Sequence, residues 1–207
     1  WKGLRPAALP AVAATPAPQG IILVHMGGAR DANIILGSTT FAGTDTAYYA
    51  TGVLNRILGD GRTGRLVRAL GGQRNWTLGT GSSFLRTVRL GVFQATAAVP
   101  AEVADSTLRV MYEEINRLRT DLVPARELER AREAVAGSFA LQLQTASQLA
   151  AATAEARLLG LPGTYIGGYR PRVLAVTAAQ VRAATRRVLP ASGLVTVVVG
   201  DATRLYA

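Results

Sequence analysis

Few side chains in this sequence could carry out chemistry. It contains no cysteine and one histidine, His25. An ordinary zinc site needs three or four ligands from His, Cys, Asp and Glu at close spacing. Neither HExxH nor the inverted HxxEH occurs, and no serine lies in a GxSxG elbow. His25 lies in the apolar run Ile21–Gly27, where we expect a hydrogen-bonded structural histidine. We therefore predict neither a metal site nor a catalytic triad.

Three glycines are spaced like those of a nucleotide-binding loop. Gly59, Gly61 and Gly64 satisfy GxGxxG, the spacing of dinucleotide-binding turns. Such a turn must follow a strand, and an acidic residue about 20 positions later must hold the ribose. Here the preceding segment AYYATGVLNRIL has helical spacing, and no acidic residue follows at that distance. The pattern predicts a turn between two helices.

Positive charge is concentrated in one part of the chain. The formal net charge is +10, and every basic residue except Lys2 is arginine. No acidic residue occurs from Gly61 to Ala101. Either these arginines are solvated on helix faces, or they form a surface for nucleic acid or other anions. The acid-free segment has few interleaved aromatic residues, which disfavours a platform for single-stranded nucleic acid. Its arginines are Arg62, Arg65, Arg68, Arg74, Arg86 and Arg89.

Length and composition set the class of protein. With 207 residues, of which 49% are hydrophobic, the chain can build a globular core. No apolar run reaches the roughly 18 residues of a membrane-spanning helix. The sequence begins at Trp1 without a signal segment, so we expect a piece of a longer protein whose compartment, cytoplasmic or exported, is not encoded here. Prolines among alanines predict a linker over residues 1–19 and a domain over 20–207.

Hydrophobic periodicity predicts an α+β domain, a mostly antiparallel sheet covered by helices. The gap between the third and fourth expected strands is too short for a crossover, so these two should form an antiparallel pair. A bend is expected near Gly137-Ser138 in one long helix over 124–158. We expect strands over Ile21–Gly27, Ala32–Ser38, Trp76–Phe84, Thr87–Val99 and Leu194–Gly200, and further helices over 47–58, 63–70, 103–118 and 177–189.

Several motifs occur in an order that resembles one peptidase family. They are WKG at Trp1–Gly3, GGARDANIILG at Gly27–Gly37, VLNRILGDGRTGRLVRAL at Val53–Leu70, WTLGTGSSF at Trp76–Phe84 and the stretch Leu158–Ala202 that ends in VVVGDA. Together they resemble the second, catalytically degenerate domain of the insulinase/pitrilysin-like zinc peptidases. This family includes bacterial two-domain processing proteases and the mitochondrial processing peptidase subunits.

The resemblance implies one repeat unit of the pitrilysin-like fold, in which paired copies enclose a chamber where unfolded peptides are cut. Zinc is then expected in a homologous catalytic domain or subunit that carries HxxEH, and no cofactor is expected in this chain. The parent protein or its partner would be a zinc metalloendopeptidase, and this chain itself a noncatalytic, substrate-enclosing domain. Cut away from its sister domain, such a unit should pair with a second copy. The alternative is a basic module that binds nucleic acid or anions without enzymatic activity.

The resemblance also implies candidate substrate-binding residues. Active members use an arginine and a tyrosine, seven residues apart, to hold the substrate backbone, and these positions fall on Gly71 and Leu78. Nearby arginines could substitute, and an aromatic residue remains in the strand. The glycine turn coincides with a loop implicated in substrate handling, and the acid-free segment is expected to face the chamber and attract acidic peptides. The candidates are Gly59, Gly61, Gly64, Arg62, Arg65, Arg68, Arg74 and Trp76.

Overall fold

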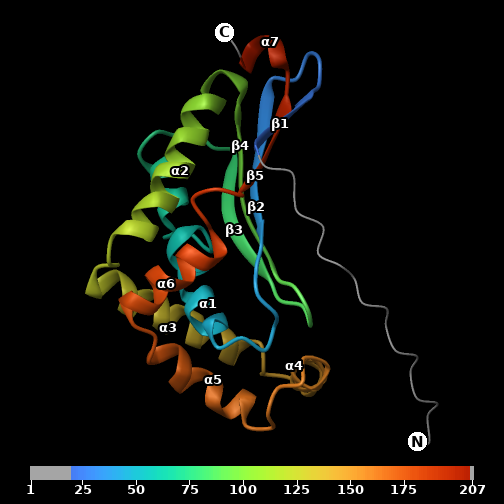
Figure 1. The fold of residues 1–207 in the computed structure, drawn as a ribbon, viewed down its shortest axis with the longest axis vertical. Coiled ribbons are helices and arrows are strands. Elements are labelled where there is room, and N and C mark those ends of the chain that lie inside the picture. Colours follow the sequence, from blue (N-terminus) through green and yellow to red (C-terminus); the bar gives the residue numbers. More distant parts are fainter. Residues whose placement is uncertain (1–19, 206–207) are drawn as a thin grey trace, which may run out of the picture.

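The computed structural model describes residues 20–205, which form one five-stranded sheet with helices packed on one side (Figure 1). The linker predicted over 1–19 lies outside the described residues. The strands are β1 (Gly20–His25), β2 (Asp31–Thr39), β3 (Gly79–Leu85), β4 (Val92–Pro100) and β5 (Val195–Gly200). Their order across the sheet is β1-β5-β2-β4-β3.

Strand pairing makes the sheet mostly antiparallel, as predicted. β2 pairs antiparallel with both β4 and β5, and β3 pairs antiparallel with β4, which confirms the expected antiparallel pair. Only β1 runs parallel to its neighbour, β5. β1 and β2 follow one another in the sequence but are not neighbours, because β5 lies between them. The last strand of the chain therefore joins the first strand to the rest of the sheet.

Helices occupy most of the remaining chain, and none in the described part is long and apolar enough to cross a membrane. Figure 1 shows α1, α2, α3, α5 and α6 on the same side of the sheet. The helices are α1 (Ala47–Leu58), the π-helix η1 (Val67–Gly72), the 3₁₀ turn η2 (Ala101–Val103), α2 (Ala104–Thr120), α3 (Ala125–Leu141), α4 (Ala146–Leu158), α5 (Tyr165–Leu174), α6 (Ala178–Val188) and α7 (Ala202–Leu205).

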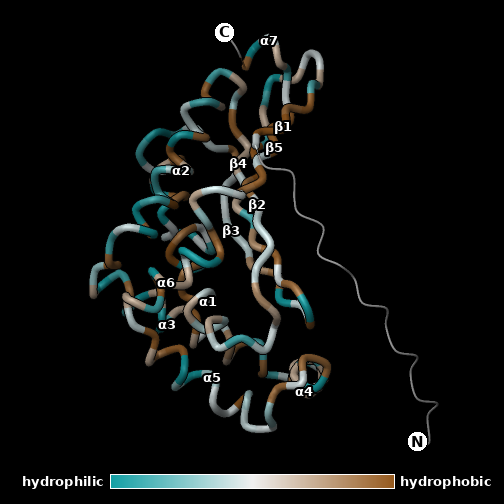
Figure 2. The backbone as a smooth tube through the Cα atoms, viewed as in Figure 1, coloured by the Kyte–Doolittle hydropathy of each residue, from teal (hydrophilic) through white to brown (hydrophobic). Residues whose placement is uncertain are grey.

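The core lies between the helices and one face of the sheet. Alternate residues of β2 and β4 point into it, and Leu36 and Phe93 have no exposed surface. Leu54 of α1 and Met111 of α2 are buried opposite them. Each such side chain contributes about 1.5–3 kcal/mol when it is fully buried. In Figure 2, brown apolar segments follow the inner strands, and teal polar segments recur along α2.

The other face of the sheet is not covered by helices in the described residues, and we call it the open face. Its side chains are apolar or neutral, except Asp31 at the start of β2. Ile35 is 40% exposed and Leu85 is 62% exposed. The open face consists of Gly20, Ile22 and Val24 of β1, Val195, Val197 and Val199 of β5, Asp31, Asn33, Ile35, Gly37 and Thr39 of β2, Val92, Gln94, Thr96, Ala98 and Pro100 of β4, and Gly79, Gly81, Ser83 and Leu85 of β3.

The single helix predicted over 124–158 is wrong. The structure has two helices, because α3 ends at Leu141 and α4 begins after Thr145. The Thr145 hydroxyl accepts the N–H of Gln148, whose side chain accepts the N–H of Thr145. This capping box starts a new helix. Gly137 and Ser138, where a bend was expected, lie within α3, and the break between the two helices comes after them, at residues 142–145.

Other differences concern the ends of elements and a helix that was not predicted. β3 begins at Gly79 and β4 at Val92, so Trp76 and Thr87 lie outside the strands in which they were expected. α5 was missed because its two glycines and Pro171 are poor helix formers. Burial of Tyr165 and Tyr169, one turn apart, stabilises it nonetheless.

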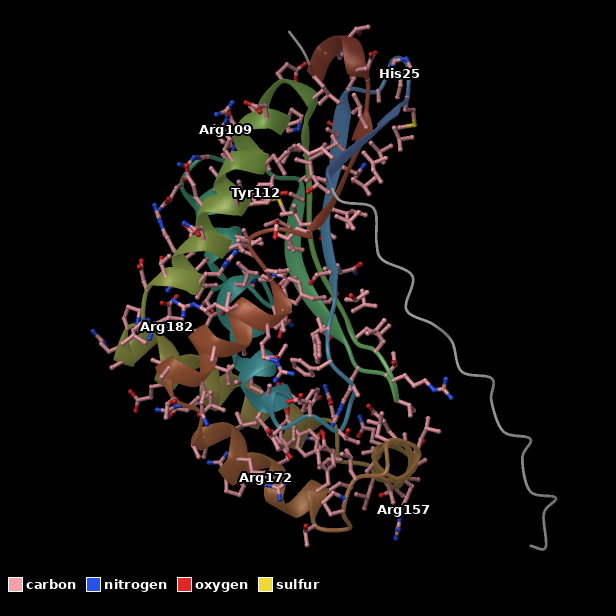
Figure 3. The ribbon with its side chains drawn as sticks, in the orientation of Figure 1. His25, Arg109, Tyr112, Arg157, Arg172 and Arg182 are labelled. Carbon is pink, nitrogen blue, oxygen red and sulfur yellow. The ribbon has the colours of Figure 1, made fainter. Side chains whose placement is uncertain are left out.

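A hydrogen-bond network joins the β1–β2 turn to the end of the chain. The Asp201 carboxylate accepts the Gly28 N–H at 2.8 Å, the Thr203 N–H at 3.0 Å and the Thr203 hydroxyl at 2.7 Å. His25 Nδ1 accepts the Ala202 N–H at 3.1 Å, so His25 is the hydrogen-bonded structural histidine that was predicted (Figure 3). The bonds from Thr203 and Gly28 lower the pKa of Asp201 below its ordinary value.

Replacing Asp201 tests whether this network stabilises the fold. We expect Asp201→Asn to lower the melting temperature at neutral pH, because the new amide group would face the Gly28 N–H. The pKa of Asp201 is lowered in the folded state, so its contribution is complete above the unfolded value of about 3.9 and lost as pH falls through the folded pKa. Thermal unfolding of both proteins from pH 7 to pH 2 measures this. A difference that is as large at pH 2 as at pH 7 would contradict the assignment.

Candidate functional site

The glycine turn between α1 and η1 is shaped by close approach to β3. A Cβ atom on Gly59 would lie 2.7 Å from the Ser82 nitrogen, and one on Gly64 would lie 2.8 Å from the Gly59 Cα. Gly61 has a φ of +91°, which L side chains rarely adopt. Steric constraints therefore require glycine at each position of the GxGxxG pattern. The element before the pattern is helix α1 and not a strand. This geometry is a tight turn and not a dinucleotide cradle.

A side-chain contact fixes the same junction. The Ser82 hydroxyl donates to Asn55 Oδ1 at 2.7 Å, which links the end of α1 to β3. Asn55 lies on α1, within the helix predicted over 47–58. The turn and the edge strand β3 therefore form one packed unit.

Two arginines that follow the turn share one carboxylate. Arg65 donates from Nε and Nη2 to the two oxygens of Glu127, at 3.0 Å and 2.7 Å, and Arg68 Nη2 reaches Glu127 at 3.3 Å. Burial disfavours the charged form of Arg65. The hydrogen bond to Glu127 and the negative charge of Glu127 outweigh this effect and raise the pKa of Arg65. Arg117 pairs with Glu114 at 2.9 Å beside them, and the group lines a hollow of about 260 Å³. The segment that is acid-free in sequence is therefore partly neutralised in space by α2 and α3.

The remaining candidates lie at the other end of η1. Arg74 Nη1 donates to the Ala69 carbonyl at 3.0 Å, and its guanidinium lies 5.3 Å from the centre of the Trp76 ring. Trp76 is half-buried against the core, just before β3. Arg62 is exposed and forms no ion pair among residues 20–205. Of the predicted site residues, Arg65 and Arg68 thus meet at the shared carboxylate of Glu127, and Arg74 contacts Trp76.

At Gly71 and Leu78, the two positions to which the resemblance assigns substrate binding, this chain has no hydrogen-bonding side chain. Gly71 is half-buried in η1, and Leu78 is 68% exposed. Trp76 and Arg74 lie close to Leu78 in sequence but are already in contact with each other. A fixed grip on a peptide backbone at these positions would have to come from the main chain.

An aromatic cluster between α1, α3, α5 and the ends of β2 and β3 was not found from the sequence. The rings of Phe139 and Tyr169 stack at 3.8 Å, and a cavity of about 450 Å³ opens beside them. The sequence signal for this cluster was the pair Tyr48 and Tyr49 and the pair Tyr165 and Tyr169, which are one helical turn apart. The second pair lies on α5, the helix that was not predicted. The cluster consists of Phe41, Tyr48, Tyr49, Phe84, Phe139, Tyr165 and Tyr169.

Metal-binding groups are scarce in the described residues. Nowhere in residues 20–205 do three His, Asp or Glu side chains lie close enough together to hold a metal ion. His25 and Asp201 approach to 3.9 Å, but both are used in hydrogen bonds with the backbone. A zinc ligand set would need a third donor there.

The sequence matches the model of a known family. Residues 2–135 match the model of the peptidase M16 inactive domain, which is more than half of the chain. A comparison with curated proteins gave no significant match.

Solved structures resemble the fold. A peptidase M16 inactive domain from Pseudomonas fluorescens superposes with a TM-score of 0.82 at 22% identity, over 93% of this chain and 47% of that one. A protease from Helicobacter pylori gives 0.80 at 17% identity, over 87% and 44%. The periplasmic protease PqqL from Escherichia coli gives 0.69 at 15%, over 87% and 20%. This chain therefore spans about half of the first two structures and a fifth of the third.

The steric role of the glycine turn can be tested by adding one methyl group. Gly64→Ala should destabilise the chain by about 1–3 kcal/mol, because the new Cβ would meet backbone atoms of Leu58 and Gly59 that cannot move away. In a chain of this size each kcal/mol lowers the melting temperature by about 2–4 °C. Gly72→Ala is the matched control, since a Cβ there has no atom within 4 Å. Equal melting temperatures for the two variants would refute the steric explanation.

Proposed function

Because this chain belongs to the peptidase M16 inactive-domain family, we propose that it forms the noncatalytic half of a peptide-enclosing chamber. The catalytic half would be a homologous domain or subunit that carries HxxEH and binds the zinc ion. Peptide hydrolysis would take place there, and this chain would contribute walls and substrate contacts.

The observation that carries the proposal is the open face of the sheet. Apart from Asp31 at one end, its strand residues are uncharged in a protein whose net charge is +10. Exposed apolar residues such as Ile35 and Leu85 typically mark a surface that contacts another chain. A neutral surface of this kind suits unfolded peptides of varied sequence, because it neither repels nor selects a particular charge. This supports a role in enclosing substrate.

We further propose that the arginines next to the edge strand β3 attract acidic peptides. Arg62 and Arg68 are exposed, and Arg74 lies beside Trp76 close to the start of β3. The attraction would be long-range and salt-dependent, since exposed charges are screened beyond about 10 Å at roughly 0.1 M ionic strength. Pairing of Arg65 with Glu127 reduces the field that the sequence alone suggests. The same pairing reduces the support for a nucleic-acid-binding module.

The activity test uses the 207-residue chain and a catalytic M16 chain with HxxEH from the same organism. We expect no cleavage of an unfolded peptide by this chain alone. Its addition should raise the cleavage rate of the catalytic chain, and a metal chelator should abolish the activity. Chelator-sensitive cleavage by this chain alone would contradict the assignment. An unchanged rate after addition would contradict the chamber.

Association of the isolated chain tests the open face directly. We expect the chain to self-associate as a symmetric dimer in moderate salt, and Ile35→Arg to shift it to monomer, because a charge at the centre of an apolar contact must be desolvated. Ala179→Arg on α6 is the control, since it adds the same charge at an exposed position of the helical layer. Sedimentation over a concentration series separates the two variants. A wild-type chain that stays monomeric, or equal effects of both variants, would count against this surface.

A further inference from the structure

A third cavity, separate from the glycine turn and the open face, lies in the helical layer. It has a volume of about 720 Å³ and lies between α1, α5, α6 and the loop before α1. Three arginines from different parts of the chain line it: Arg86 after β3, Arg172 on α5 and Arg187 on α6. We call it the arginine cavity. Much of the rest of its lining is apolar and small, including Ala50, Pro162 and several other alanines.

Arg86 is the most constrained of the three. Its guanidinium lies 3.7 Å from the centre of the Tyr48 ring, its Nε donates to the Gly43 carbonyl at 2.6 Å, and its Nη1 donates to the Tyr165 hydroxyl at 2.9 Å. These contacts hold the group in one orientation. Arg86 is half-buried, yet it has no carboxylate partner among residues 20–205. A partly desolvated charge without a counter-ion is unfavourable and leaves a preformed place for an anion.

The other two arginines differ in their partners. Arg187 pairs with Asp45 through both nitrogens, at 3.3 Å and 2.8 Å. Arg172 donates to the Tyr49 hydroxyl at 2.9 Å and has no carboxylate partner in the described part of the chain. Three positive charges and one negative charge therefore line the cavity.

The tyrosines do not neutralise this excess. Burial raises the pKa of Tyr165, so its hydroxyl is uncharged at neutral pH. Tyr165 can accept the hydrogen bond from Arg86 without supplying a negative charge. Among residues 20–205, the Asp45 carboxylate is thus the only negative charge in the lining of the cavity, and it is paired with Arg187.

We propose that the arginine cavity binds a carboxylate group of a peptide, with Arg86 and Arg172 as its hydrogen-bond donors. Arginine binds carboxylates in bidentate geometry, and the apolar lining can hold the aliphatic part of a peptide. The choice of a peptide as ligand rests on the proposed function, whereas the need for an anion rests on the arginines alone. The carboxylate can come from the end of a peptide chain or from an acidic side chain.

Calorimetric titration of the 207-residue chain tests the proposal with short probes. The probes are acetyl-Leu-Ala-Leu with a free carboxylate, the same peptide with a C-terminal amide, acetyl-Ala-Glu-Ala-amide and inorganic phosphate. We expect the free acid to bind and the amidated form to bind at least about tenfold more weakly. Comparable binding of the glutamate peptide assigns the site to acidic side chains as well as chain ends. Equal binding of the acid and its amide, or preference for inorganic phosphate over both acidic peptides, would overturn the proposal.

Variants separate the cavity from the general positive charge of the chain. Arg172→Gln should weaken binding of the free acid about tenfold. Tyr49→Phe removes the hydroxyl that orients Arg172 but keeps the ring, and it should weaken binding about two- to fivefold. Arg157→Gln on α4 removes the same charge from an exposed position that does not line the cavity, and it should change binding less than twofold (Figure 3). Equal losses from Arg172→Gln and Arg157→Gln would refute a specific site.

The fold of each variant is checked by circular dichroism. If Arg172→Gln unfolds, Tyr49→Phe still decides the outcome, since unchanged binding in that variant would refute the role of Arg172. The result is also independent of the peptidase assay. A chain that accelerates a catalytic partner but binds no carboxylate would overturn this inference alone, and the reverse result would overturn the proposed function alone.

Discussion

Burial of one face of the sheet fixes the pairing register on which both the core and the open face depend. Leu36 on β2 pairs with Ala95 on β4, and both side chains are fully buried against the helices. A shift of β2 by one residue would expose Leu36 and place Asn33 in the core, which is strongly unfavourable. The same register places Ile35 and Thr96 opposite each other on the open face. A single choice of strand pairing therefore determines which residues are packed and which can meet another chain.

Much of this architecture could be predicted from the sequence, because strong local signals agree with the final packing. The apolar run Ala32–Ser38 located β2. A helix was expected to begin at Thr177, and the structure shows that Thr177 and Gln180 form the capping box that starts α6. The order of motifs correctly indicated the insulinase-like family and an α+β fold. The break between α3 and α4 was missed because both segments have helical periodicity and only the cap at Thr145 separates them. α5 was missed because burial of its tyrosines outweighs unfavourable propensity, which local sequence does not reveal.

The candidate site was harder to predict than the fold, because charge was counted along the chain and not in space. Arg65 and Arg68 come from an acid-free segment, but Glu127 on α3 reaches both of them. Arg86 belongs to the same segment and has the opposite environment, a tyrosine cage without a carboxylate in the described residues. Only the packing of distant helices distinguishes the two. The glycines of the GxGxxG pattern were placed in a turn correctly, but the contact with β3 that requires Gly59 joins residues far apart in sequence.

Residues 20–205 form a stable core without any cluster of metal-binding side chains, because the packed residues are separate from the ionisable ones. Phe93 and Leu36 stabilise the sheet through contacts that need no ionisable group, and the Gly59–Gly64 turn is required by space alone. The two remaining surfaces differ in electrostatics, since the open face is nearly free of charge and the arginine cavity carries an excess of positive charge. Contact with a chain of any sequence therefore suits the first surface, and recognition of one ionised group suits the second.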